Sequence, residues 1–176
     1  SAQYRRELAV DLTEEDPTVP GYAPGSVQLT RHPDAAAQDA RALLGVSLEE
    51  QKQWKDVYEA LNHWREALEQ LGILVFHFEG VEVEEARGFS LGQMPFPIIG
   101  VNGKDSPAGR VFTLMHEFVH LLLDAPGISD LRETPAVRTQ DQQIEVFCNR
   151  VAGAILVPGP DLLAHRAVQN ASSATQ

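Results

Sequence analysis

His116-Glu117-Phe118-Val119-His120 is the stretch of this 176-residue chain that decides its fold, because it places two histidines four residues apart in a helix-forming context. At about 100° per residue, such side chains lie one above the other on one helix face. Both imidazoles can therefore reach one cation. Glu117 lies beside that face, so its carboxylate can reach a water at the cation instead. The spacing is the H-E-x-x-H pattern of zinc hydrolases, and it predicts that His116 and His120 bind a metal and Glu117 is the general base.

The residues around this motif predict a buried helix over 107–123. Ser106 is a good N-cap and Pro107 suits the first helical position, while Pro126-Gly127 follows the predicted end. Apolar residues surround the motif on every side, which is typical of a helix buried all round: Val111, Phe112, Leu114, Met115, Phe118, Val119, Leu121, Leu122 and Leu123. Buried charges are normally paired or bound to metal. The alternative is a His-Glu-His hydrogen-bond network without metal.

The order of the remaining elements predicts an α+β domain. We expect further helices over residues 34–44, 47–71, 141–157 and 162–168, and strands over 73–79, 88–91 and 97–101. We expect residues 1–34 to be a loosely structured lead-in, because three Pro/Gly turn signals interrupt it. Residues 35–168 would form the folded domain and residues 169–176 a polar tail. The strand at 97–101 could bind an extended substrate by edge pairing.

A catalytic zinc usually has three protein ligands, so a third must come from elsewhere in the chain. Glu145 is the best candidate, because it lies on the next predicted helix. Asn149 follows one helical turn later, where it can support a ligating histidine by a hydrogen bond. Asp124 and Asp130 are weaker candidates for the third ligand, and a solvated surface position is the other interpretation of Glu145.

Composition restricts the class of partner and the compartment. The formal net charge of −11 argues against direct binding of nucleic acid by this chain. The single cysteine, Cys148, cannot form an internal disulfide and suits a reducing cytoplasm. We find no apolar run of membrane-spanning length and expect no membrane partner.

Two long motifs resemble the ImmA/IrrE family of metallopeptidases. Arg110-Val-Phe-Thr-Leu-Met-His-Glu-Phe-Val-His-Leu-Leu-Leu123 is similar to that family's R-x-F-T-x-x-H-E-x-x-H-L-L-L. Glu145-x-x-x-Asn149-x-x-Ala152-x-x-x-Leu156-x-Pro158 is similar to its E-x-x-x-N-x-x-A-x-x-L-L-x-P helix. The resemblance covers roughly residues 35–165. One departure is Val119, where the family usually has glycine.

The resemblance implies a zincin-like domain, with helices packed on a small, mostly antiparallel sheet and the H-E-x-x-H helix against it. It implies Glu145 as third ligand of a zinc ion, although manganese could bind the same residues. It also implies cleavage of a helix-turn-helix transcriptional repressor in stress response or mobile-element regulation. The alternative is a non-catalytic domain that senses a metal or ligand and binds a repressor without cutting it. His77, Arg110 and His165 are candidates for stabilising the oxyanion, and each also has a structural interpretation.

Overall fold

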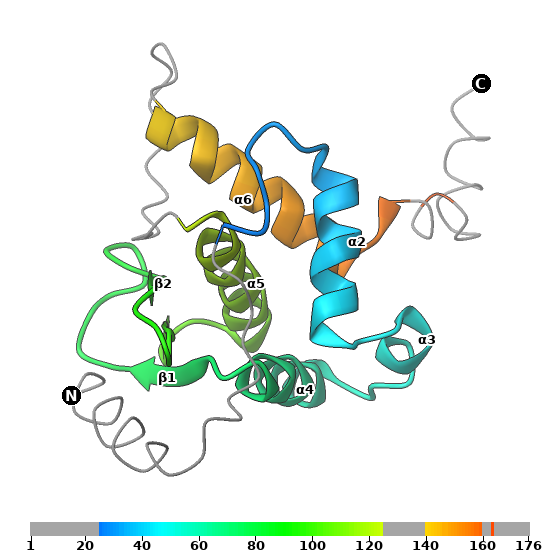
Figure 1. Cartoon of the computed structure of the whole chain (residues 1–176). Helices are drawn as coiled ribbons and strands as arrows, with labels where there is room; N and C mark the ends of the chain where they lie inside the picture. Colours follow the sequence, from blue (N-terminus) through cyan, green and yellow to red (C-terminus); the bar gives the residue numbers. More distant parts are fainter. Residues whose placement is uncertain (1–24, 125–139, 160–162, 164–176) are drawn as a thin grey trace, which may run out of the picture.

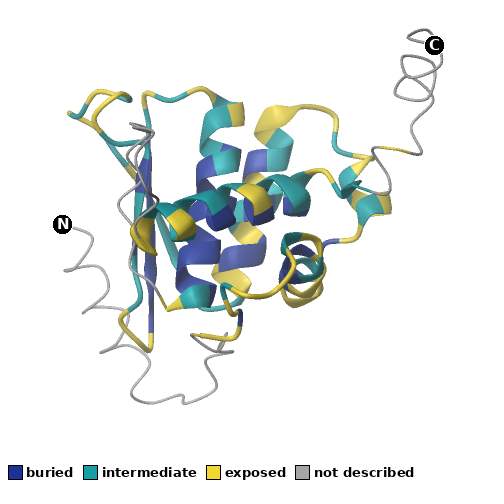
Figure 2. Ribbon diagram, turned by 90° about the horizontal axis from the view of Figure 1, so that it is seen from above, coloured by how far each residue is buried: buried dark blue, intermediate teal, exposed yellow. Residues whose placement is uncertain are grey.

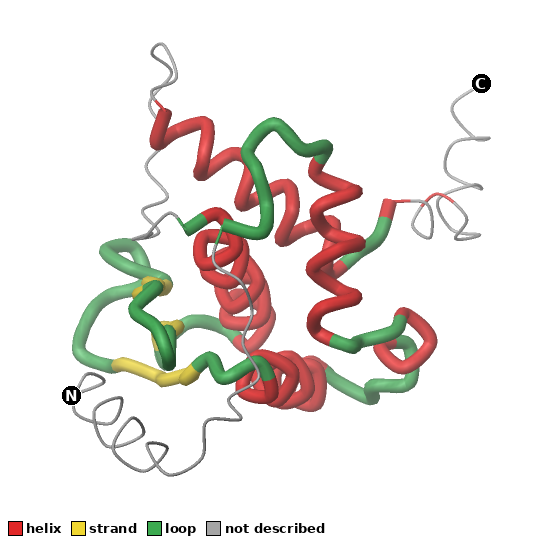
Figure 3. Tube along the Cα trace, viewed as in Figure 1, coloured by secondary structure: helices red, strands yellow, loops and turns green. Residues whose placement is uncertain are grey.

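The computed structural model describes residues 25–124, 140–159 and 163, which form an α+β arrangement of helices and one three-stranded sheet (Figure 1). Figure 3 shows the strands together at one side of the helices. The elements in chain order are α2 Pro33–Leu44, α3 Leu48–Gln51, α4 Val57–Gln70, β1 Leu74–Phe78, β2 Gly88–Leu91, β3 Ile98–Asn102, α5 Pro107–Leu123 and α6 Gln140–Leu156. The predicted α+β class is confirmed.

Helix α5 is the central element, and its predicted bounds are confirmed. The Ser106 hydroxyl accepts a hydrogen bond of 3.1 Å from the backbone N–H of Gly109, with Pro107 in the first turn. Asp124 ends the helix in the left-handed region, at φ 54°. Every residue from 113 to 122 is buried. The helix therefore carries the His-Glu-His motif through the middle of the core, as its apolar surroundings predicted.

The sheet is mixed, with strand order β1-β3-β2. β1 pairs with β3 in parallel and β2 pairs with β3 in antiparallel. The prediction of a mostly antiparallel sheet is therefore wrong, because β3 runs in the same direction as β1 and one of the two strand pairings is parallel. β3 is the central strand and both of its edges are paired. The prediction that the strand at 97–101 binds substrate by edge pairing is wrong because β1 and β2 already occupy both of its edges; among the described strands, β1 and β2 are the outer ones.

The predicted single helix over 47–71 is two helices in the structure. Ser47 caps α3, where its hydroxyl accepts a hydrogen bond from the backbone N–H of Glu50. α4 begins after Asp56, whose carboxylate accepts hydrogen bonds of 2.9 Å from the N–H groups of Tyr58 and Glu59. Asp56 adopts the extended backbone of an N-cap and therefore interrupts the helix. The sequence prediction missed this second N-cap, because the apolar residues recur at helical spacing on both sides of it.

The helices lie on one side of the sheet (Figure 2), where α5 packs on β2 and β3 and α4 contacts β1. α5 contacts α4, α6, β2 and β3, and α2 packs against α6. The core is continuous and draws on all of these helices and on β3; its alanines on α2 (Ala36, Ala37 and Ala40) permit close helix packing. Val119, the departure from the family pattern, is fully buried in this core.

Part of the predicted lead-in belongs to this packed structure. Val27 is buried, and its backbone N–H donates a hydrogen bond of 3.2 Å to the carbonyl of Leu122 at the end of α5. Residues 1–24, most of the predicted helix at 162–168 and the tail at 169–176 lie outside the described residues. The domain boundaries therefore stay predictions. Within the described ranges, none of the helices is long and apolar enough to cross a membrane.

Candidate metal centre

Three side chains from two helices converge on one point. His116 and His120 of α5 place their Nε2 atoms 3.0 Å apart. Glu145 of α6 places one carboxylate oxygen 3.2 Å from the Nε2 of His116 and the other 3.1 Å from the Nε2 of His120. These three residues are the group among the described residues that could hold a metal ion. The predicted ligands therefore lie together, although 24 residues separate His120 and Glu145 in the chain.

The spacing of these atoms fits a tetrahedral metal ion. Nitrogen and oxygen ligands lie about 2.0–2.2 Å from zinc, so two ligands of a tetrahedral site are about 3.3–3.5 Å apart. The observed separations of 3.0–3.2 Å are shorter by a few tenths of an ångström. Each Nε2 carries at most one hydrogen, so hydrogen bonds alone can use at most two of the three contacts. A cation between the atoms would interact with all of them, and the donor set therefore fits a metal.

The three side chains differ in their access to solvent. The side chains of His116 and His120 are 5% and 2% exposed, whereas that of Glu145 is 34% exposed. The centre is therefore embedded on the α5 side and reaches the surface at the carboxylate. A catalytic zinc site needs such an open position for water or substrate, whereas a structural site is closed.

Electrostatics keep the Glu145 carboxylate ionised. Burial would raise its pKa, but the hydrogen-bond contacts with His116 and His120 and the charges of these histidines outweigh that effect and lower the pKa to about 2. Cys148, one turn of α6 away, responds in the opposite direction. Burial and the nearby charges of Glu145 and Glu117 raise the pKa of this thiol, so it stays protonated. A buried, protonated thiol of this kind is unreactive and packs as a small apolar side chain.

Glu117 lies on a different side of α5 from the two histidines. It is fully buried, and a methyl group placed on Gly88 of β2 would lie 3.3 Å from its Cγ atom. The histidines thus face α6 and the glutamate faces β2, because adjacent residues of a helix point in directions about 100° apart. The side chain of Glu117 is not among the three candidate ligands. Its role as general base stays a prediction.

Within the described part of the chain, Asn149 makes no hydrogen bond to His116 or His120 that would support its predicted role. Asn149 is half-buried one turn after Glu145. The Nδ1 atom of His116 is buried and has no hydrogen-bond partner among the described residues. Ligating histidines usually donate from this second nitrogen to an acceptor. The supporting role of Asn149 therefore stays a prediction.

The weaker candidates for the site lie elsewhere or outside the described residues. Asp124 forms the C-cap of α5 and is not in the candidate ligand group, and Asp130 lies outside the described residues. His77 lies on β1 with an exposed side chain; partial desolvation and then the nearby charges of Arg110 and Arg65 lower its pKa. The charge of Arg110 therefore acts on His77, and neither residue belongs to the candidate ligand group. His165 also lies outside the described residues.

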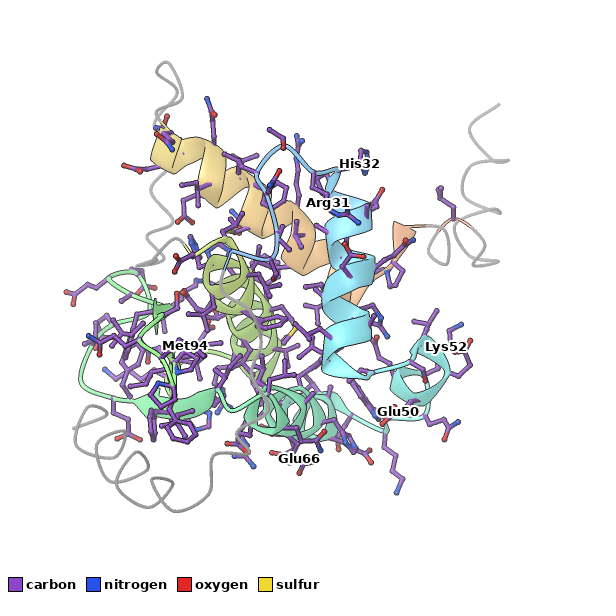
Figure 4. The ribbon with its side chains drawn as sticks, viewed as in Figure 1. Arg31, His32, Glu50, Lys52, Glu66 and Met94 are labelled. Carbon is purple, nitrogen blue, oxygen red and sulfur yellow. The ribbon has the colours of Figure 1, made fainter. Side chains whose placement is uncertain are left out.

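The β2 strand and the loop after it have features that sequence reasoning missed. Met94, in the loop between β2 and β3, is 45% exposed near the sheet, whereas Glu50 and Lys52 lie at α3, away from the sheet (Figure 4). Ser90 on β2 is buried beside α5. The alternation of small residues at 88 and 90 was the signal that could have indicated a strand packed closely on the motif helix.

Comparison with known proteins agrees with the motifs. A family model described as the IrrE N-terminal-like domain, which is a peptidase family, matches residues 68–173. That range covers more than half of the chain and includes all three candidate ligands and Glu117. Searches of curated proteins and of solved structures gave no match.

Proposed function

The chain belongs to the IrrE N-terminal-like domain family, and on that basis we propose that it is a metal-dependent endopeptidase that cleaves a helix-turn-helix transcriptional repressor. The observation that carries the chemistry is the convergence of His116, His120 and Glu145, with Glu117 buried next to His116 in the sequence of the same helix. Support for the repressor as substrate comes from the resemblance of the two long motifs to the ImmA/IrrE family.

His116, His120 and Glu145 would hold the metal ion. Two imidazoles and one carboxylate favour zinc, and manganese is the alternative. When bound, the ion would act as a Lewis acid that polarises the scissile carbonyl and lowers the pKa of a bound water. Glu117 accepts the proton of the attacking water and returns it to the leaving amine. Because Glu117 is fully buried, bulk solvent has little access to its carboxylate.

The substrate segment would bind in an extended form along β2. This strand lies at the sheet edge, and its inner face packs on α5 beside Glu117. An exposed strand edge can hydrogen-bond an added chain through backbone groups, which gives affinity without strict sequence preference. A helix-turn-helix repressor would have to present a linker or locally unfolded segment to bind in this way.

The setting that we propose is a reducing cytoplasm, where the protein would act in stress response or in the control of a mobile element. Cys148 is the single cysteine of the chain and is buried, which is compatible with that compartment. The acidic net charge of −11 argues against direct contact with DNA.

The decisive experiment is incubation of the zinc-loaded protein with a candidate helix-turn-helix repressor, such as one encoded beside it, followed by mass spectrometry. We expect two complementary fragments from a single peptide bond, no fragments after chelation, and none with Glu117→Gln. Glu117→Gln keeps the side-chain size and all three candidate ligands but removes the base. Fragments that persist with this variant would contradict the assignment of Glu117.

The same experiment distinguishes the non-catalytic alternative. A regulator that only binds the repressor would form a complex with it and produce no fragments. Glu117→Gln would then leave both the complex and its effect in cells unchanged. That outcome would retain the metal centre and reject the peptidase activity.

A further inference from the structure

The inner face of β2 lies directly against the Glu117 side of α5. Gly88 and Ser90 are buried, whereas the alternate residues Phe89 and Leu91 are half-buried, so the first pair faces the helix. A methyl group on Gly88 would lie 2.3 Å from Thr113 Cγ2 and 3.3 Å from Glu117 Cγ. β2 therefore approaches α5 most closely beside the proposed base.

Ser90 occupies the next inward position along the strand. Two residues further, a methyl group on Gly92 would lie 3.9 Å from Leu121 Cδ2 and 3.8 Å from Asp124 Oδ1. Gly88 thus faces the turn of α5 that contains Glu117, and Gly92 faces the end of the helix. Ser90 lies between these two contacts. Its side chain is therefore placed against the part of α5 that carries the H-E-x-x-H motif.

The hydroxyl of Ser90 is buried without a hydrogen bond to any described residue. Ser90 is 1% exposed, and its Oγ atom has no hydrogen-bond partner among the described residues. Buried polar atoms without partners are rare in folded proteins, and a catalytic role is one of the accepted explanations. The opposite strand position is Ile99, which is apolar and fully buried, so the sheet itself offers this hydroxyl no side-chain acceptor.

We propose that Ser90 is a positioning residue whose hydroxyl, which makes no hydrogen bond within the described part of this structure, donates one to the Glu117 carboxylate when substrate is bound and directs that carboxylate toward the attacking water. A carboxylate is an acceptor and a hydroxyl can donate, so the two groups are complementary. Gly88 makes this contact possible, because any side chain there would hold the strand away from the helix. The inference rests on the proposed function, which assigns the base role to Glu117.

The first test separates this role from a structural one. Ser90→Ala removes a buried hydroxyl without a partner, so the unfolding temperature should stay the same or rise. We expect kcat to fall about tenfold, with KM and zinc affinity within twofold of the wild type. Ser47→Ala is the matched control. It removes a serine that caps α3, so it should lower the unfolding temperature and leave kcat unchanged.

The second test does not require turnover. A peptide hydroxamate binds a metal through its oxygens. Its N–H and O–H groups can also donate hydrogen bonds to a neighbouring carboxylate. Its affinity for the zinc-loaded protein should fall about five- to tenfold with Ser90→Ala. In a Glu117→Gln background, Ser90→Ala should have no further effect, because the two residues act through one contact.

The outcomes are distinct for the two proposals. If the wild type binds the hydroxamate but cleaves no protein, the peptidase proposal fails and the double-mutant cycle still decides the role of Ser90. Equal hydroxamate affinities of wild type and Ser90→Ala, or independent effects of Ser90→Ala and Glu117→Gln, would overturn the Ser90 inference. A lowered unfolding temperature with unchanged function would overturn it too, and would make Ser90 structural. A zinc-loaded wild type that binds no hydroxamate would overturn both proposals.

Discussion

Gly88→Ala is expected to destabilise the protein, because the added methyl group has no room between β2 and α5. It would lie 2.3 Å from Thr113 Cγ2, 2.9 Å from the carbonyl oxygen of Gly100 and 3.3 Å from Glu117 Cγ. The methyl of Thr113 belongs to a stiff, β-branched side chain. The carbonyl of Gly100 belongs to the central strand, which is paired on both sides. Neither neighbour can move without moving a whole element.

The magnitude follows from two opposing effects. Alanine restricts the unfolded chain and would stabilise by about 0.4–1 kcal/mol if it fitted. Overpacking of a well-packed core costs about 1–3 kcal/mol, and contacts this short lie at or above the upper end of that range. We therefore expect a net loss of about 2–4 kcal/mol. For a chain of this size, that loss lowers the unfolding temperature by about 5–15 °C. Circular dichroism of the chelator-treated protein measures it without a contribution from metal binding.

Two variants make the reasoning testable. Gly153→Ala is the matched control, because Gly153 lies inside α6 and, apart from that helix's own backbone, no atom of the described residues lies within 4 Å of the added methyl; it should stabilise by about 0.5–1 kcal/mol. Thr113→Ser removes the methyl group that Gly88→Ala would meet, so the double variant should recover about 1–2 kcal/mol relative to additivity. A neutral or stabilising Gly88→Ala, or strict additivity with Thr113→Ser, would refute the close packing of β2 on α5.

Three further predictions concern the metal, the ligand helix and the thiol. Zinc at about 1,000 times its Kd should raise the free energy of unfolding by about 4 kcal/mol, and Glu145→Gln should lose most of this gain in the same calorimetric titration. Arg41→Met should lower the free energy of unfolding by about 2–4 kcal/mol in urea, because Arg41 donates to the carbonyls of Ile155 (2.6 Å) and Val46 (3.0 Å); an unchanged midpoint would contradict it. Cys148 should react with a thiol reagent only after unfolding, because burial raises its pKa, and rapid labelling of the native protein would contradict this.

The parts of the structure that sequence predicted are those set by local chemistry. Ser106 and Pro107 define the start of α5 whatever the rest of the chain does. The four-residue spacing of His116 and His120 fixes their common face in any helix. Their convergence with Glu145 was predictable because the chemistry of a metal site demands a third ligand. In each case, a short stretch of chain contains the whole physical cause.

The parts that sequence did not predict depend on contacts between distant elements. Nothing within residues 97–101 tells whether that strand is paired on one edge or both; β1 and β2 decide it. The break between α3 and α4 depends on one capping carboxylate, Asp56, within a continuous apolar periodicity. Ser90 looks like an ordinary strand residue until the register with β3 shows which side of the sheet it faces. Pairing and register are tertiary properties, so local patterns carry little information about them.

The structural unit that holds the metal centre begins well before the range that the family model matches. α2 and α3 precede residue 68, yet they hold the end of α6 in place. Arg41 and Gln51 donate hydrogen bonds of 2.6 and 2.8 Å to the carbonyls of Ile155 and Leu156, which have no partner within the helix because they lie in its last turn. Small residues on α2 and α6 also pack into the same core. Since Glu145 lies on α6, its distance from the two histidines of α5 depends on these contacts ten or more residues away. The two family motifs therefore supply the candidate ligands, and the helices outside the matched range help to set the geometry in which those side chains meet.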